Sequence, residues 1–107
     1  MRAYIGEFEQ LVLLAILRLE SGATGAAIRA TVAEGSERTV WIGAVHTTLE
    51  RLEAKGLVCS TVAPLPSARG GRRKIYSIQP AGREAIADAY QTWVRMTRGL
   101  KPRLGSP

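Results

Sequence analysis

Six basic residues lie in a stretch of the sequence that contains no acidic residue. The stretch runs between Glu53 and Glu84 and contains Lys55, Arg69, Arg72, Arg73, Lys74 and Arg83. The whole chain has 15 Lys and Arg against 9 Asp and Glu, a formal net charge of +6. Because bases and acids are equal in number elsewhere, this one segment carries the net charge. The pattern is expected for a surface that binds a polyanion, and a solvated basic loop is the alternative interpretation.

Residues that could carry out catalysis or hold a metal are scarce. His46 and Cys59 are the single copies of their types, and the chain has no Asn to orient a Cys–His nucleophile pair. Glu50 and Glu53 follow His46 at spacings usual for pairs on a helix surface, which argues against a zinc site. The motifs GxxxxGK, GxSxG and HExxH are absent. We therefore expect neither an enzyme nor a cofactor.

The apolar segments are too short to cross a membrane. The longest uninterrupted apolar run, residues 11–17, has seven residues, whereas a membrane-spanning helix needs about 20. The first residues lead directly into Glu7 and Glu9, without the apolar stretch of a secretory leader. We expect a cytoplasmic protein with no membrane partner, in which Cys59 is a small buried hydrophobe on a strand.

Three helical patterns occupy the first half of the chain, which has 107 residues of which 46% are hydrophobic. Residues 7–20 are apolar on nearly every side, which predicts a central helix that also touches a second subunit. Residues 24–34 form a shorter helix that breaks at Gly35, and residues 42–55 a third that ends at Gly56. The apolar stripe of the third helix is Val45, Leu49 and Leu52. Its outward face is expected to carry Ala44, His46, Thr47, Thr48, Arg51 and Lys55.

The second half of the chain predicts a hairpin followed by one more helix. Residues 57–62 and 74–78 favour strands, and the loop between them is rich in Pro and Gly. Pro80 begins a helix that continues to about Arg98, and residues 101–107 form a frayed tail. The order is therefore three helices, two strands and a helix. We expect a mainly α fold with a two-stranded β-hairpin, arranged as a winged helix-turn-helix whose third helix fits a DNA major groove.

Several segments resemble the PadR family of bacterial transcriptional regulators, and specifically its small subgroup with a single C-terminal helix. The resemblance rests on residues 6–13 (GEFEQLVL), Gly25 with Ile28 and Arg29, residues 43–58 (GAVHTTLERLEAKGLV), residues 70–78 (GGRRKIYSI) and residues 80–84 (PAGRE). It implies a homodimeric transcription factor, usually a repressor, that binds double-stranded DNA. The expected division is a winged-helix DNA-binding domain (1–79), a C-terminal dimerisation helix (80–100) and a flexible tail (101–107).

Two groups of site residues follow from the basic segment and from the resemblance. The DNA-binding group is Ala44, His46, Thr47, Arg51, Arg69, Arg72, Arg73 and Lys74. Here the arginines would read guanine or bind phosphate, and Ala44 would offer a methyl group to thymine. His46 stands where the family usually has Tyr, and Trp41 stands where it has a small polar residue such as Ser. Trp41 cannot cap the third helix as Ser would.

The second group belongs to the expected dimer interface. Its members are Phe8, Tyr90, Trp93 and Met96. A Trp in the apolar stripe of a C-terminal helix is most often a core or dimer contact. The resemblance further implies that Trp93 and its symmetry mate could stack a flat aromatic effector between the subunits. The alternative to a DNA-binding regulator is a winged-helix module whose basic hairpin docks an acidic protein partner.

Overall fold

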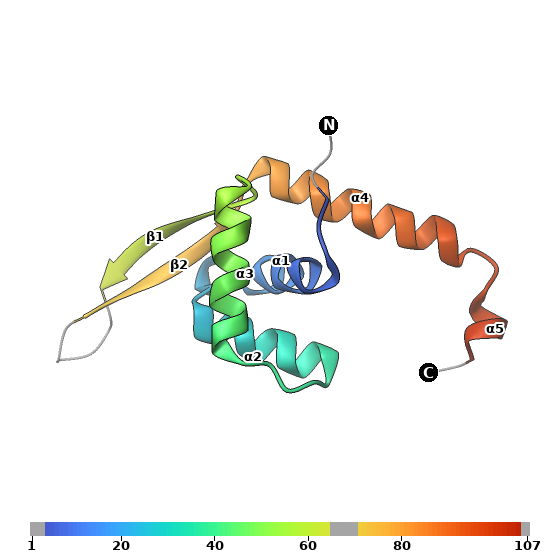
Figure 1. Cartoon of the computed structure of the whole chain (residues 1–107), viewed down its shortest axis with the longest axis horizontal. Coiled ribbons are helices and arrows are strands. Elements are labelled where there is room, and N and C mark those ends of the chain that lie inside the picture. The colour runs from blue at the N-terminus through green and yellow to red at the C-terminus, as the bar shows by residue number, and fades with distance from the viewer. Residues whose placement is uncertain (1–3, 65–70, 106–107) are drawn as a thin grey trace.

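The computed structural model describes residues 4–64 and 71–105. Figure 1 shows three helices, a hairpin and a long C-terminal helix in chain order. The elements are α1 (Glu7–Leu19), the 3₁₀-helix η1 (Glu20–Gly22), α2 (Gly25–Ser36), α3 (Ile42–Ala54), β1 (Val58–Pro64), β2 (Arg72–Ile78), α4 (Pro80–Thr97) and α5 (Lys101–Leu104). The predicted fold class, a mainly α winged helix-turn-helix followed by a C-terminal helix, is confirmed.

The helix α1 lies at the centre of the core, as its nearly continuous apolar sequence predicts. Its residues Val12, Leu13, Ala15 and Ile16 are buried, and it contacts α2, α3 and α4. Glu9 in its first turn accepts a hydrogen bond from the Gly6 amide at 3.0 Å, which satisfies one of the free N–H groups before the helix. Because α1 contacts the other three long helices, it is the element against which α2, α3 and α4 all pack.

The helix α3 packs on this core through the stripe that its sequence predicts. Val45, Leu49 and Leu52 are fully buried, and the helix ends before Gly56, whose φ of 74° is the left-handed conformation expected of a helix stop. One prediction was wrong: Thr48 was expected on the outward face but is only 6% exposed. Thr48 lies three residues after Val45 and four before Leu52, so helical geometry places it on the same inward face.

The hairpin is antiparallel, with Val58 opposite Ile78 and Pro64 opposite Arg72. Its inner end is attached to the junction between η1 and α2, where the amide of Tyr76 donates to the carbonyl of Ala23 at 2.8 Å. The Tyr76 side chain is buried there. The outer end extends away from the helices (Figure 1). The hairpin is therefore firmly held at one end and presented to solvent at the other.

The helix α4 begins in close contact with Leu57, which lies between α3 and β1, and then leaves the body of the protein. Gln79 donates its amide to the carbonyl of Leu57 at 2.9 Å, and Gly82 is buried against the same carbonyl. Ala85 and Ile86 are buried, whereas the second half of α4 extends beyond the core on the side opposite the hairpin (Figure 1). Within the described residues, no helix is both long and apolar enough to span a membrane.

Some element boundaries differ from the predicted ones by a few residues. The helix α2 continues through Gly35 to Ser36, because the Ser36 hydroxyl donates to the Val32 carbonyl at 2.7 Å and a left-handed Glu37 then ends the helix. The strand β2 begins at Arg72 rather than at Lys74, since pairing with β1 continues out to Pro64. Cys59 lies on β1 as predicted and is half-buried.

Candidate nucleic-acid interface

One face of α3 presents three of the predicted DNA-binding residues. Ala44, Thr47 and Arg51 are all exposed, and their spacing places them along a single face of the helix. The opposite face is the buried stripe already described, so the core holds the exposed face in position. The predicted exposure of these three residues is confirmed, and their role in binding DNA stays a prediction.

His46 lies beside this face, against the first turn of α2. A side chain at Gly25 would place its Cβ atom 2.9 Å from Cε1 of His46, closer than such atoms approach in proteins. The absence of a side chain at Gly25 therefore makes room for the imidazole. His46 remains exposed, so its ring can still meet a ligand that covers α3.

The outer part of β2 carries the basic residues of the hairpin. Arg72, Arg73 and Lys74 are exposed and pair across the hairpin with Pro64, Ala63 and Val62. Arg73 and Lys74 also line the hollow between the hairpin and α3. Arg69, the fourth predicted base, lies outside the described residues.

A hollow of about 650 Å³ separates the hairpin from α3. It brings together residues from α2, α3 and β2: Thr24, Gly25, Ala26, His46, Glu50, Glu53, Arg73, Lys74 and Tyr76. Sequence reasoning did not place the two carboxylates here, although their spacing from His46 contained the signal. Glu53 accepts a hydrogen bond from the Ser60 hydroxyl at 2.9 Å. Burial, followed by the charges of Glu53 and Glu50, raises the pKa of Tyr76.

These carboxylates determine which parts of the hollow can receive an anion. Glu50 and Glu53 would repel a phosphate placed at the α3 side of the hollow, whereas Arg73 and Lys74 at its hairpin side would attract one. A polyanion is therefore best accommodated along the outer face of α3 and the outer end of β2. His46, which also lines the hollow, stands at the boundary between them.

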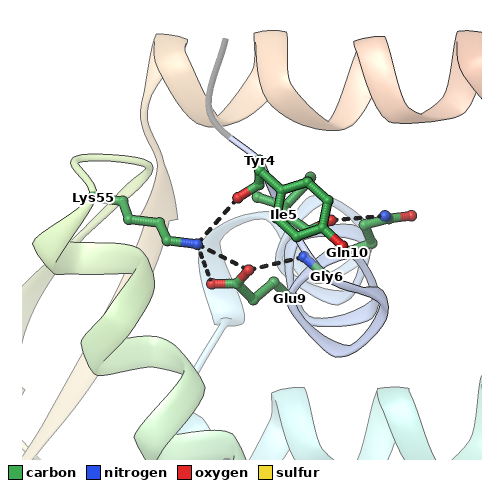
Figure 2. Close-up of polar contacts among 6 residues, drawn as sticks. All are labelled: Tyr4, Ile5, Gly6, Glu9, Gln10 and Lys55. Carbon is green, nitrogen blue, oxygen red and sulfur yellow. Dashed lines mark hydrogen bonds and ion pairs between the residues drawn. The ribbon is translucent and has the colours of Figure 1, made fainter.

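Lys55 does not belong to this basic surface, although it lies in the acid-free stretch. Figure 2 shows its ammonium group directed at the start of α1. Its Nζ atom lies 2.8 Å from Oε2 and 3.0 Å from Oε1 of Glu9, and it donates to the Tyr4 carbonyl at 3.2 Å. Burial alone would raise the pKa of Glu9. The hydrogen bonds from Lys55 and Gly6, with the charges of Lys55 and Arg51, outweigh burial and lower that pKa.

A second surface lies between α1 and α4. It is a mostly apolar groove of about 510 Å³ lined by Gln10, Leu14, Leu17, Arg83, Ile86, Ala87, Tyr90 and Trp93. Trp93 is 60% exposed, and Tyr90 and Met96 are exposed as well. Phe8, the fourth residue predicted for the interface, is instead half-buried against the core. Leu14 was not among the predicted interface residues; its signal was the apolar sequence around all of α1.

The chain is similar to known regulators in both sequence and fold. The model of the family described as "Transcriptional regulator PadR-like family" matches residues 13–88. No protein of curated function matches significantly. Among solved structures, a PadR family transcription regulator from Clostridium difficile is 24% identical with a TM-score of 0.74, and the match covers 94% of this chain and 100% of that one.

Two further structures have the same fold. A PadR-like transcriptional regulator from Bacillus cereus is 22% identical with a TM-score of 0.74, over 94% of this chain and 93% of its own. A Streptococcus transcriptional regulator is 22% identical with a TM-score of 0.73, over 92% of both chains. The fold and the exposed α3 face therefore agree with the family match, and the chain belongs to the PadR-like family of transcriptional regulators, which are DNA-binding proteins rather than enzymes.

Proposed function

We propose that this regulator is a homodimeric repressor that binds double-stranded DNA sequence-specifically and acts in the cytoplasm. The observation that carries the proposal is that the exposed face of α3 and the basic outer end of β2 belong to the two elements that border one hollow. A helix about 10–12 Å across fits a major groove about 12 Å wide. With α3 in the major groove, the hairpin would lie on the sugar-phosphate backbone of the DNA beside that groove.

Some of the predicted DNA-binding residues would then contact bases, and others would bind phosphates. Thr47 and Arg51 would contact bases or phosphates, and Ala44 would contact a thymine methyl group. His46 would donate a hydrogen bond to a phosphate. The bases of the hairpin would neutralise phosphates and release counterions: Arg69, Arg72, Arg73 and Lys74.

The groove between α1 and α4 supports the dimer. The exposed side chains of Leu14, Tyr90 and Trp93 gather along this groove, and clustered exposed apolar side chains rather than scattered ones mark interaction sites. In the proposal, residues 80–100 of each copy cover this groove on the other, and residues 1–79 bind DNA. Residues 101–107, which include α5, form a tail outside both units.

Release from DNA would follow from a planar aromatic ligand at the dimer interface. The ligand would stack on Trp93 and its symmetry mate, because flat aromatic surfaces associate through their faces. It would lower DNA affinity only if it bound more tightly to a dimer geometry in which the two α3 helices no longer match two half-sites. The mostly apolar lining around Trp93 supports this choice of ligand chemistry.

Fluorescence anisotropy against two duplexes tests the DNA-binding part of the proposal. One duplex is the promoter of the encoding gene, the other is a scrambled duplex of equal length, and each is measured at two salt concentrations. The proposal predicts preferential promoter binding by about a thousandfold, with affinity falling steeply as salt rises. Binding to neither duplex at low salt would contradict it and favour a module that docks an acidic protein.

A further inference from the structure

The start of α3 exposes two large apolar side chains. Trp41 is 75% exposed and Ile42 is 42% exposed. Among the residues that the structure describes, the other exposed large apolar side chains lie elsewhere: Tyr4, Leu14, Val62, Tyr90, Trp93, Met96 and Leu104. The proposed dimer would cover the groove between α1 and α4, but this groove includes neither Trp41 nor Ile42. Their exposure needs another explanation.

Trp41 stabilises the start of α3 less than a usual N-cap residue would. It occupies the N-cap position in an extended conformation, with φ −87° and ψ 139°, and makes no side-chain capping bond. Ser, Thr, Asp or Asn at such a position accepts a hydrogen bond from the first turn and stabilises the helix. Since the indole also lies largely in water, packing does not compensate for the missing cap. Positions that break a local rule in this way are often functional.

The backbone that presents these side chains is firmly held. The preceding residue, Val40, is buried, and its carbonyl accepts a hydrogen bond from Nη1 of Arg29 at 3.4 Å. The Trp41 carbonyl accepts from the amides of Ala44 and Val45 at 3.1 and 3.3 Å. The indole therefore extends from a fixed point at the end of α3, rather than from a loose connection.

The first turn of α3 contains no side chain that can form a strong hydrogen bond with a base. After Trp41, its residues are Ile42, Gly43, Ala44 and Val45. It also has no acidic residue that would repel DNA. A major groove offers one prominent apolar feature to such a surface, the C5-methyl group of thymine. The chemistry of the turn thus selects thymine among the base edges.

We propose that Trp41 and Ile42 are specificity-determining residues that contact thymine methyl groups in the operator, an inference that rests on the DNA binding proposed above. Ile42 lies one turn before His46 on α3, beside the exposed face on which Thr47 and Arg51 lie further along the helix. The indole and the Ile42 side chain cover one or more methyl groups at the point where α3 enters the groove. Replacing thymine by a base without the methyl group uncovers this surface.

Deoxyuridine substitution tests the contact at the level of single methyl groups. Duplexes are enriched from a random-sequence pool with the full-length protein, and the best one is remade with each thymine replaced in turn by deoxyuridine. Because deoxyuridine keeps the base pairing and lacks only the methyl group, we expect about fourfold weaker binding at each contacted position, the effect of uncovering one such group. The ratio should be equal at two salt concentrations, since no charge is involved.

Trp41→Ser distinguishes this role from a structural one. Serine caps the helix, so the variant should have a raised melting temperature and yet lose the penalty for deoxyuridine. The exposed Leu104→Ser change on α5, at the far end of the molecule from α3 (Figure 1), is the matched control and should keep the full penalty. If Trp41→Ser abolishes DNA binding altogether, Ile42→Ser provides the same comparison.

The outcomes separate this inference from the proposed function. Enrichment of a specific duplex whose binding is unchanged by every deoxyuridine substitution would overturn the thymine contact and leave DNA binding intact. An equal deoxyuridine penalty in wild type, Trp41→Ser and Ile42→Ser would also overturn it, because the methyl groups would then be read elsewhere. Failure to enrich any duplex would contradict the proposed function, and the thymine contact with it.

Discussion

Nζ of Lys55 lies 2.8 Å from Oε2 of Glu9, and this ion pair joins the C-terminal cap of α3 to the first turn of α1 (Figure 2). Lys55 follows the final residue of α3, whereas Trp41 precedes its first. The helix proposed to enter DNA is therefore tied, at the end remote from Trp41, to the helix that forms one wall of the α1–α4 groove. A movement of α1 at that groove is therefore transmitted to α3 through the Lys55–Glu9 ion pair.

The Lys55–Glu9 pair should contribute measurably to stability. Lys55→Met and Glu9→Gln should each lower the free energy of unfolding in urea by about 1 kcal/mol, because both remove a partly exposed ion pair. The amide oxygen that Glu9→Gln introduces can still accept the hydrogen bond from the Gly6 amide. The double variant should show a coupling of about 0.5 kcal/mol. Additive single effects would show that the ion pair contributes nothing of its own.

The pH dependence of unfolding is the control for this pair. Since the folded protein holds the pKa of Glu9 below its ordinary value, the stabilisation is fully present above the pKa of the unfolded chain. It is lost as the pH falls through the folded pKa. Wild type should therefore lose its advantage over Glu9→Gln in acid. A difference between the two that stays constant across this range would contradict the account.

Gly82 should tolerate no side chain. A Cβ atom there would fall against the backbone carbonyl of Leu57 and 2.8 Å from Cγ1 of Ile78, so α4 would have to move. We expect Gly82→Ala to lower the free energy of unfolding by about 2 kcal/mol or more. The matched control is Gly35→Ala in α2, where the new methyl group meets no atom within 4 Å. That change should instead stabilise the protein by up to about 1 kcal/mol. If Gly82→Ala and Gly35→Ala changed the free energy of unfolding equally, the close contact at Gly82 would not be what excludes a side chain there.

Gly25 should affect DNA affinity through His46 rather than through folding. A methyl group at Gly25 would displace the imidazole, which can move without disturbing the core because it is exposed. We expect Gly25→Ala to keep the melting temperature and to weaken DNA binding about fivefold, as His46→Ala would by removing one hydrogen bond. The double variant should bind no more weakly than either single one. Additive losses in anisotropy would show that Gly25 acts independently.

Much of this structure could be predicted from residue patterns, and the exceptions have physical reasons. Val45, Leu49 and Leu52 were expected inside and are buried, because apolar spacing alone specifies a helix face. Thr48 was misplaced because its hydroxyl suggested solvent, although its position on the helix dictated burial. The partner of Lys55 could not be inferred, since Glu9 lies in another helix and its proximity depends on tertiary packing. The spacing of Glu50 and Glu53 from His46 places the three on one side of α3, but only tertiary packing decides that this side meets the hairpin.

The dimer proposal predicts that one charge on α4 will separate the subunits. Wild type should sediment at about twice the 11.6 kDa mass of the chain, and Trp93→Glu should weaken association at least about a hundredfold because it places a carboxylate in an apolar contact. Gln91→Glu adds the same charge to an exposed position on the opposite side of α4 and should remain dimeric. A monomeric wild type, or equal effects of both changes, would contradict the proposed interface.

The salt dependence of DNA binding with and without the hairpin bases tests the central claim most directly. Anisotropy of the enriched duplex is measured over a series of salt concentrations for wild type and for the double variant Arg72→Ala/Arg73→Ala. If both arginines neutralise phosphates, the slope of log affinity against log salt should become shallower by about 1.8. Arg95→Ala/Arg98→Ala, which removes two exposed charges near the end of α4, should leave the slope almost unchanged. Equal slopes for wild type and the hairpin variant would contradict the assignment of this surface to DNA.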